Sequence, residues 1–173
     1  MLVTLGARAE VDGVVDLLAA CHRRIRQHIV LARRLILQGT ASSAQELRET
    51  AGQVRRYFTI ALPLHIADED LSIAPRIRET SAELDAAVAQ VASDHAEHQH
   101  MIDTLSALCG ELEREPARLA AVEGQLAGVL DVLAPELARH LELEERIVFP
   151  AVRELPASVR SDLLVEVRAR RYT

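Results

Sequence analysis

HIADEDLSIAPRIRE, at residues 65–79, recurs in altered form as HLELEERIVFPAVRE at residues 140–154. Both stretches have a histidine, then a glutamate four residues later with a second acidic residue after it, and then Pro, a β-branched residue, Arg and Glu in the same register. Chance agreement at all of these positions is improbable. The repeat therefore indicates two equivalent structural units in one chain, and it is the most specific signal in the sequence.

Each copy of the repeat lies in a tract whose apolar residues recur with the period of an α-helix. Residues at i and i+4 lie one turn apart on the same side of a helix, so His65 and Glu69 can present an imidazole and a carboxylate to one point, as can His140 and Glu144. The same faces carry large apolar residues, namely Phe58, Leu62 and Ile73 in the first tract and Leu133, Leu137 and Val148 in the second. Each tract is therefore predicted to place one imidazole and one carboxylate in an apolar core.

Four long tracts with helical periodicity, separated by short breaks, determine the predicted fold. They cover approximately residues 12–38, 44–79, 81–114 and 116–154, and a short fifth tract covers about 158–171. Ser43 and Glu46 have the spacing of a capping box at the start of the second tract, and short connections favour antiparallel neighbours. The sequence predicts an all-α protein, an up-down-up-down four-helix bundle over about 11–154 with a short extra C-terminal helix, forming one domain over residues 1–173.

Composition excludes several classes of protein. The 173 residues include 26 acidic residues, 20 arginines, seven histidines and two cysteines, with a formal net charge of −6 and no lysine. The acidic balance argues against nucleic acid as a partner, and no apolar stretch approaches the ~20 residues of a transmembrane helix. The N-terminal stretch does not resemble a secretory signal, and two cysteines do not make a disulfide scaffold. We expect a cytoplasmic protein that binds neither nucleic acid nor a membrane.

The two carboxylates of the repeat point to a bound metal. A buried carboxylate needs compensating positive charge, and no arginine shares a helix face with Glu69 or Glu144. A divalent or trivalent metal ion meets this need, and mixed imidazole and carboxylate ligation suits iron, manganese or zinc. Two equivalent half-sites in one core predict a dinuclear centre in which Glu69 and Glu144 bridge the metals.

The first and third tracts supply matching histidines. His22 precedes His65 by 43 positions and His95 precedes His140 by 45, so the two halves of the chain repeat as helix pairs. His98 lies one turn beyond His95 on the same face. Three roles fit His98: a second ligand on that helix, a proton donor to a bound ligand, or a core histidine with satisfied hydrogen bonds.

These motifs resemble those of hemerythrin-like (HHE cation-binding) domains over nearly the whole chain, from about residue 11 to 154. The matching elements are CHRRI at 21–25, HIADEDLSIAP at 65–75, DHAEH at 94–98 and HLELEERIVFP at 140–150. The resemblance implies a four-helix bundle that holds two non-haem iron ions and binds or responds to dioxygen. Carried over position by position, it implies the ligands His22, His65, Glu69, His95, His140 and Glu144.

The chain departs from oxygen-carrying hemerythrins at two places. Those proteins have two histidines four residues apart on the third helix, whereas Gln99 stands four residues after His95. On the fourth helix they use an aspartate five residues after the histidine, where this chain has Glu145; Glu144 is better placed, because a residue at i+5 is turned about 140° around the helix. These differences favour a redox-active or sensing centre over simple reversible oxygen carriage.

Three functions are therefore compatible with the sequence. The sequence favours a di-iron protein that binds or responds to dioxygen, peroxide or nitric oxide as a sensor, scavenger or carrier, together with a reductase or signalling partner. The alternatives are an enzyme of the di-iron oxidase or peroxidase type, and a metal-free helical interaction module in which the repeat has no chemical role. A protein that binds metal and oxygen is favoured over an enzyme.

Several residues near the motifs are expected to have no direct role. Solvated side chains are predicted for four acidic residues, with a hydrogen bond to a ligand imidazole as the alternative; they are Asp68, Asp70, Glu142 and Glu145. His28 and His100 lie off the ligand face, and Cys21 and Cys109 are predicted to be buried, inert thiols. The arginine-rich end at 168–172 is predicted to be a frayed helix end, with a partner contact as the alternative.

Pro63 and Pro135 each precede a predicted ligand histidine by a few residues. Two interpretations fit these prolines equally well: a tolerated kink in a long helix, and a kink that opens the bundle around the metals.

Overall fold

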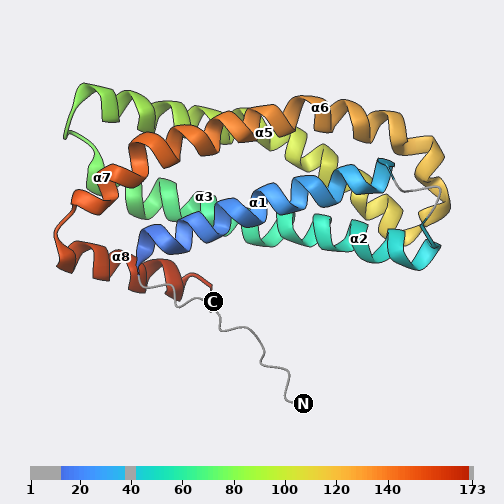
Figure 1. The fold of residues 1–173 in the computed structure, drawn as a ribbon, viewed down its shortest axis with the longest axis horizontal. Coiled ribbons are helices and arrows are strands. Elements are labelled where there is room, and N and C mark those ends of the chain that lie inside the picture. The colour runs from blue at the N-terminus through green and yellow to red at the C-terminus, as the bar shows by residue number, and fades with distance from the viewer. Residues whose placement is uncertain (1–12, 38–41, 172–173) are drawn as a thin grey trace, which may run out of the picture.

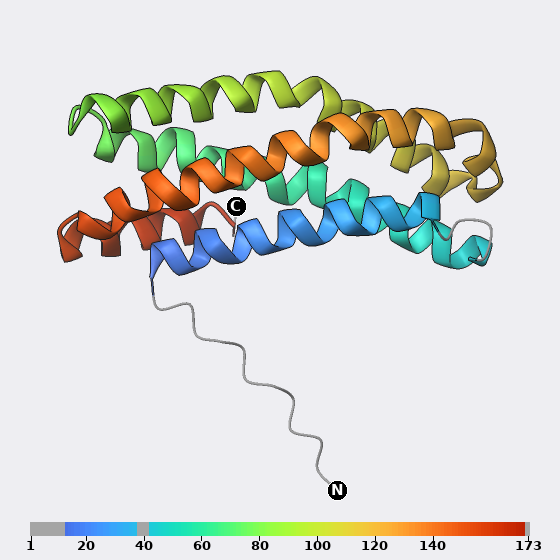
Figure 2. The ribbon, with the colours of Figure 1, turned by 45° about the horizontal axis from the view of Figure 1, so that its top comes forward.

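The computed structural model describes residues 13–37 and 42–171, and all the long elements that it shows are helical. Four of them lie side by side along the molecule (Figures 1 and 2). The first is α1 (Val14–Leu37) and the third is α5 (Ala82–Arg114). The second and fourth long elements are each built from several helical segments. The all-α bundle with a short C-terminal helix is thereby confirmed. The expected end of the first tract at Gln38 and Gly39 lies outside the described residues, as does Tyr172.

The second and fourth long elements contain π-helical turns between α-helical segments. The second consists of α2 (Ala44–Arg56), η1 (Tyr57–Ala61), α3 (Leu62–Ala67), η2 (Asp68–Ile73) and α4 (Ala74–Ile77). The fourth consists of the short 3₁₀ turn η3 (Pro116–Arg118), α6 (Leu119–Leu143), η4 (Glu144–Val148) and α7 (Phe149–Glu154). The predicted capping box of Ser43 and Glu46 is present at the start of α2.

Each π-helical turn ends two residues before a proline. The residue after each turn donates its backbone N–H to the carbonyl five residues back; these residues are Leu62, Ala74 and Phe149. The next residue in each case is a proline, namely Pro63, Pro75 and Pro150. A proline ring in a regular α-helix collides with the carbonyl four residues back, and the wider π turn relieves this collision. Each proline of the repeat thus follows a wide turn that begins at or beside the repeat's glutamate. Pro135 differs, since it lies inside α6 with its ring exposed.

The buried interior has an apolar cluster at each end of the bundle and polar residues between them. One cluster includes Ile25, Leu62, Ile102 and Leu137, and the other includes Leu18, Ile73, Val91 and Val148. The predicted faces are confirmed, because every residue assigned to the two stripes around the repeat is buried. The buried histidines and glutamates lie at the junction of the two clusters.

The last helix, α8 (Ala157–Ala169), packs against α1 and η2 (Figure 1). Arg170 and Arg171, directly after it, both form ion pairs with Asp68; the distance between Arg171 Nη2 and Asp68 Oδ2 is 2.6 Å. Asp68 is fully buried. Two predictions were therefore wrong: Asp68 is not solvated, and the arginine-rich end is fixed to the bundle by a pair of charges that sequence spacing does not reveal.

No helix in the described part of the chain combines the length and the apolar character needed to cross a membrane.

We predict that Asp68→Ala lowers the free energy of unfolding of the metal-free protein by about 2–3 kcal/mol, because removing one partner of a buried ion pair is strongly destabilising. Urea unfolding followed by circular dichroism measures the change. Glu142→Ala is the control, since Glu142 is exposed and surface substitutions usually change stability by about 0.5 kcal/mol or less. Equal losses in the two variants would contradict the assigned ion pairs.

Candidate metal centre

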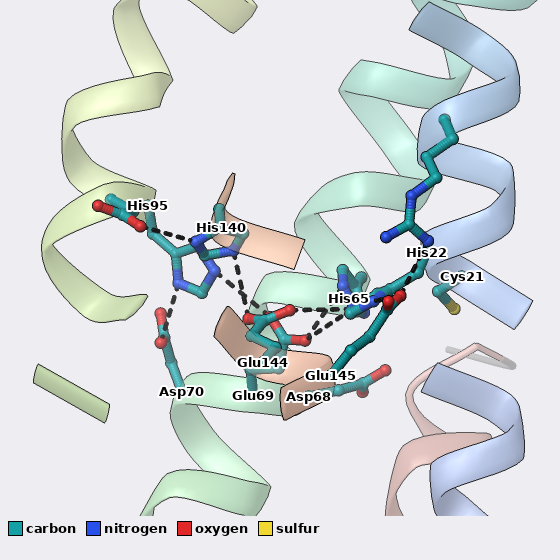
Figure 3. A network of polar contacts seen from close by, with 12 residues as sticks. Cys21, His22, His65, Asp68, Glu69, Asp70, His95, His140, Glu144 and Glu145 are labelled. Carbon is teal, nitrogen blue, oxygen red and sulfur yellow. Dashed lines mark hydrogen bonds and ion pairs between the residues drawn. The ribbon is translucent and has the colours of Figure 1, made fainter. Parts of the chain in front are cut away.

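Six residues predicted from the sequence as metal ligands come together in the interior of the bundle (Figure 3). They come from every long element: His22 from α1, His65 from α3, Glu69 from η2, His95 from α5, His140 from α6 and Glu144 from η4. All six side chains are buried. Their nitrogen and oxygen atoms form two groups, each compact enough to hold one metal ion, and both glutamates belong to both groups.

The first group combines two histidines of the N-terminal half with both glutamates. His65 Nε2 lies 3.1 Å from Glu69 Oε1, and His22 Nε2 lies 2.9 Å from Glu144 Oε2. His22 Nε2 is also 3.9 Å from Glu69 Oε1. One oxygen of each glutamate therefore faces the nitrogen atoms of this pair of histidines.

The second group mirrors the first in the C-terminal half. His140 Nε2 lies 3.2 Å from Glu144 Oε1, and His95 Nε2 lies 3.3 Å from Glu69 Oε2. Each glutamate thus turns one carboxylate oxygen to each pair of histidines. This is the arrangement that a carboxylate needs in order to bridge two metal ions.

The atoms at the centre of the cluster lack hydrogen bonds. Within the described residues, no hydrogen bond of acceptable geometry is made by the four carboxylate oxygens of Glu69 and Glu144 or by Nε2 of His22, His65 and His95. Buried polar atoms in proteins are almost always hydrogen-bonded or bound to an ion. The orphaned atoms and the mixed imidazole and carboxylate donors fit a pair of metal ions such as iron.

Three of the four histidines donate a hydrogen bond from Nδ1 to a carboxylate. The acceptors are Glu145 Oε1 for His22 at 2.9 Å, Asp70 Oδ1 for His95 at 3.1 Å and Asp94 Oδ2 for His140 at 3.1 Å. Such contacts fix the tautomer that leaves Nε2 available to a metal and orient the ring.

The prediction of solvated side chains holds for some of the acidic residues near the repeat and not for others. Asp70 and Glu145, predicted to be solvated, are partly exposed but take the alternative role of holding an imidazole, while Glu142 is exposed as predicted. Sequence reasoning missed Asp94. Its signal was its place directly before His95 in the motif of the third tract.

The charges of the cluster shift the pKa values of its histidines. Burial lowers the pKa of His22, but the close negative charges of Glu144 and Glu69 outweigh burial and raise this pKa to about 10. Burial also lowers the pKa of His140, and its contacts with Glu144 and Asp94 raise it to about 9. Without metal, protons on the imidazoles supply the positive charge that the carboxylates require.

The remaining histidines lie outside the two ligand groups. His98 is buried, with its ring 5.6 Å from that of His140, and burial followed by the charge of His140 lowers the pKa of His98. His28 is partly buried and stacks on Tyr57 at 3.9 Å between ring centroids. His100 is exposed. The predicted absence of His28 and His100 from the ligand face is consistent with these positions.

Comparison with known protein families agrees with this geometry. The model of the hemerythrin HHE cation-binding domain matches residues 13–152. No curated protein matches the chain closely enough to add to this result. The match covers the first copy of the repeat, the second copy as far as Val152, and all six residues of the cluster. The chain therefore belongs to the hemerythrin HHE cation-binding domain family.

Proposed function

We propose that the protein holds two non-haem iron ions and binds or responds to dioxygen, peroxide or nitric oxide. The proposed ligands are His22, His65, Glu69, His95, His140 and Glu144. The observation that carries the proposal is that the two oxygens of each glutamate face different pairs of histidines. Four imidazoles and two bridging carboxylates leave coordination positions for a small ligand, and iron supplies the capacity to bind and reduce it.

A small apolar cavity beside the cluster favours a diatomic or peroxide ligand over an organic substrate. Its apolar walls are Ile25, Leu62, Ile66, Ile102 and Leu137, and its polar walls are His65, His95, His98 and His140. The cavity volume is about 10 Å³, which holds about one water-sized molecule. This size supports a sensor, scavenger or carrier of a small molecule, with a reductase or signalling protein as partner.

We assign His98 the role of hydrogen-bond donor to that ligand. Its ring lines the cavity and lies outside both groups of ligand atoms. Of the three roles that fit the sequence, a donor to the bound ligand agrees both with the position of His98 in the cavity wall and with its place outside the two groups of ligand atoms. A donor beside a bound peroxide also supports the alternative that the protein acts on peroxide as an enzyme.

The metal-free interaction module is the weaker alternative. A bundle without metal would bury two carboxylates whose oxygens make no hydrogen bonds among the described residues. Apolar residues of similar volume would serve a purely structural core better.

Protein loaded with iron should contain two iron ions per chain and be coloured in air, with a spectrum that changes when dithionite is added. The double substitution of His65 and His140 by Ala should abolish both properties, because it removes one imidazole from each group. The matched control, His28→Ala with His100→Ala, should leave metal content unchanged. Elemental analysis and absorption spectra measure these results, and wild-type protein with well under one metal per chain would contradict the proposal.

Metal affinity should rise with pH between about pH 6 and 9, because metal binding displaces protons from His22 and His140, whose pKa values are about 10 and about 9 in the metal-free protein. These raised pKa values stabilise the folded metal-free protein. The contribution is fully present below about pH 6.5, the ordinary pKa of histidine, and is lost as the pH rises through 9 and 10. Metal titration and thermal unfolding across this range test both statements.

In contrast to the metal-free form, metal-loaded protein should not show the loss of stability at alkaline pH, since its imidazoles carry no proton at Nε2. A metal affinity that is independent of pH would contradict the assignment of these two histidines as ligands.

His98→Leu should retain two iron ions per chain and slow the reaction with peroxide by about 10²-fold, the lower end of the effect of a positioned proton donor. Stopped-flow absorption measures the rate. His100→Leu, which changes an exposed histidine two residues away, should react at the wild-type rate. Loss of one iron ion from the His98 variant would instead identify His98 as a ligand.

A further inference from the structure

Among the proposed ligands and the residues beside them, namely the acid after each glutamate and the residue before the first histidine, the two halves of the centre correspond with one chemical exception. His22 corresponds to His95, His65 to His140, Glu69 to Glu144 and Asp70 to Glu145. In both halves the acidic residue after the glutamate binds Nδ1 of a histidine in the opposite half. The residue before the first histidine also corresponds, but it is Asp94 in the C-terminal half and Cys21 in the N-terminal half.

The equivalent histidines His140 and His65 differ in the hydrogen bonding of Nδ1. His140 donates from Nδ1 to Asp94 at 3.1 Å. His65, which is 2 % exposed, makes no hydrogen bond of acceptable geometry from Nδ1 among the described residues. Its Nε2 faces Glu69, so its Nδ1 corresponds to the nitrogen from which His140 donates to Asp94. Cys21 stands at the sequence position that Asp94 occupies in the other half, so the position that offers a carboxylate to His140 offers none to His65.

The surroundings of Cys21 also differ from those of Asp94. Cys21 is buried, and Arg171, which forms an ion pair with Asp68, donates to its sulfur at 3.8 Å. Asp94 lies on the partly exposed side of α5, where Gln90 donates to its other oxygen. The second half of the centre therefore has two carboxylates behind its histidines, whereas the first half has one carboxylate and one thiol.

A carboxylate that accepts the Nδ1–H of a ligand imidazole makes that imidazole a stronger donor to the metal. Sulfur is a weak hydrogen-bond acceptor. His140 should therefore bind a metal ion more strongly than His65, although the direct ligands of the two ions are of the same kinds.

We propose that Cys21 makes the two metal positions unequal, so that the ion held by His95 and His140 is bound more tightly and more readily kept in the higher oxidation state. Cys21 acts as a positioning residue through His65. The inference rests on the dinuclear site of the proposed function. It concerns the relative metal affinity of the two positions rather than the small molecule that the protein binds.

Titration of metal-free protein with Co²⁺ under argon, read by visible absorption and by competition with a chelator, tests the inference. Cys21→Asp should tighten the weaker binding step by about 10–100-fold, the usual size of an effect from a residue behind a ligand imidazole, and so narrow the gap between the two steps. Asp94→Cys should also narrow the difference in affinity between the two binding steps, because it weakens the tighter step. Repulsion between the two cations is common to all the variants, so the change in the gap is the readout.

Cys109→Ala is the matched control, because Cys109 is also a buried thiol on a bundle helix but lies about 21 Å from His95 along α5, at 1.5 Å per residue. It should leave both steps unchanged. Mössbauer spectra of protein loaded with ⁵⁷Fe give a second measurement: two distinct iron signals of equal area in the wild type, and more similar signals in Cys21→Asp. Circular dichroism confirms that each variant is folded.

The inference is overturned if folded Cys21→Asp and Asp94→Cys both keep the wild-type gap, or if the two wild-type steps have equal affinity. These results would leave the dinuclear site intact. Binding of fewer than two Co²⁺ ions at saturation would contradict the dinuclear site itself, and the inference with it.

Discussion

The side chains of Glu69 and Glu144 lie in the interior of the bundle, where a carboxylate is stable only if positive charge surrounds it. The protein places four imidazoles around these two groups. In the metal-free form, contacts with these carboxylates raise the pKa values of His22 and His140 to about 10 and about 9, which favours their protonated forms near neutral pH. Under the proposed function, metal ions and protons compete for the same positions, and the rest of the architecture holds these six side chains together between two apolar clusters.

Wide helical turns give the glutamates their positions. Glu69 lies within η2 and Glu144 begins η4, and each turn is closed by a proline six residues after the glutamate. The repeat thus specifies both a chemical group and the local backbone that carries it. This explains why the proline belongs to the pattern as firmly as the histidine does.

The bundle and the six clustered residues could be predicted from the sequence because helical periodicity assigns each of them to a buried face. The duplication then related one half of the chain to the other. Contacts between distant segments could not be predicted in this way. Asp68 is adjacent to Glu69 in sequence but is neutralised by Arg170 and Arg171, about a hundred residues later, and the contact of Asp94 with His140 depends on how two helices face each other.

The duplication has an evolutionary consequence. Each half of the chain supplies two histidines and one glutamate, and each group of ligand atoms takes its second glutamate from the other half. A half-length ancestor would have needed to pair with a second copy of itself to complete the site, and such a homodimer must carry identical residues at both positions. A single chain that carries both halves is free of that restriction, so a mutation can change one side while the other stays as it is.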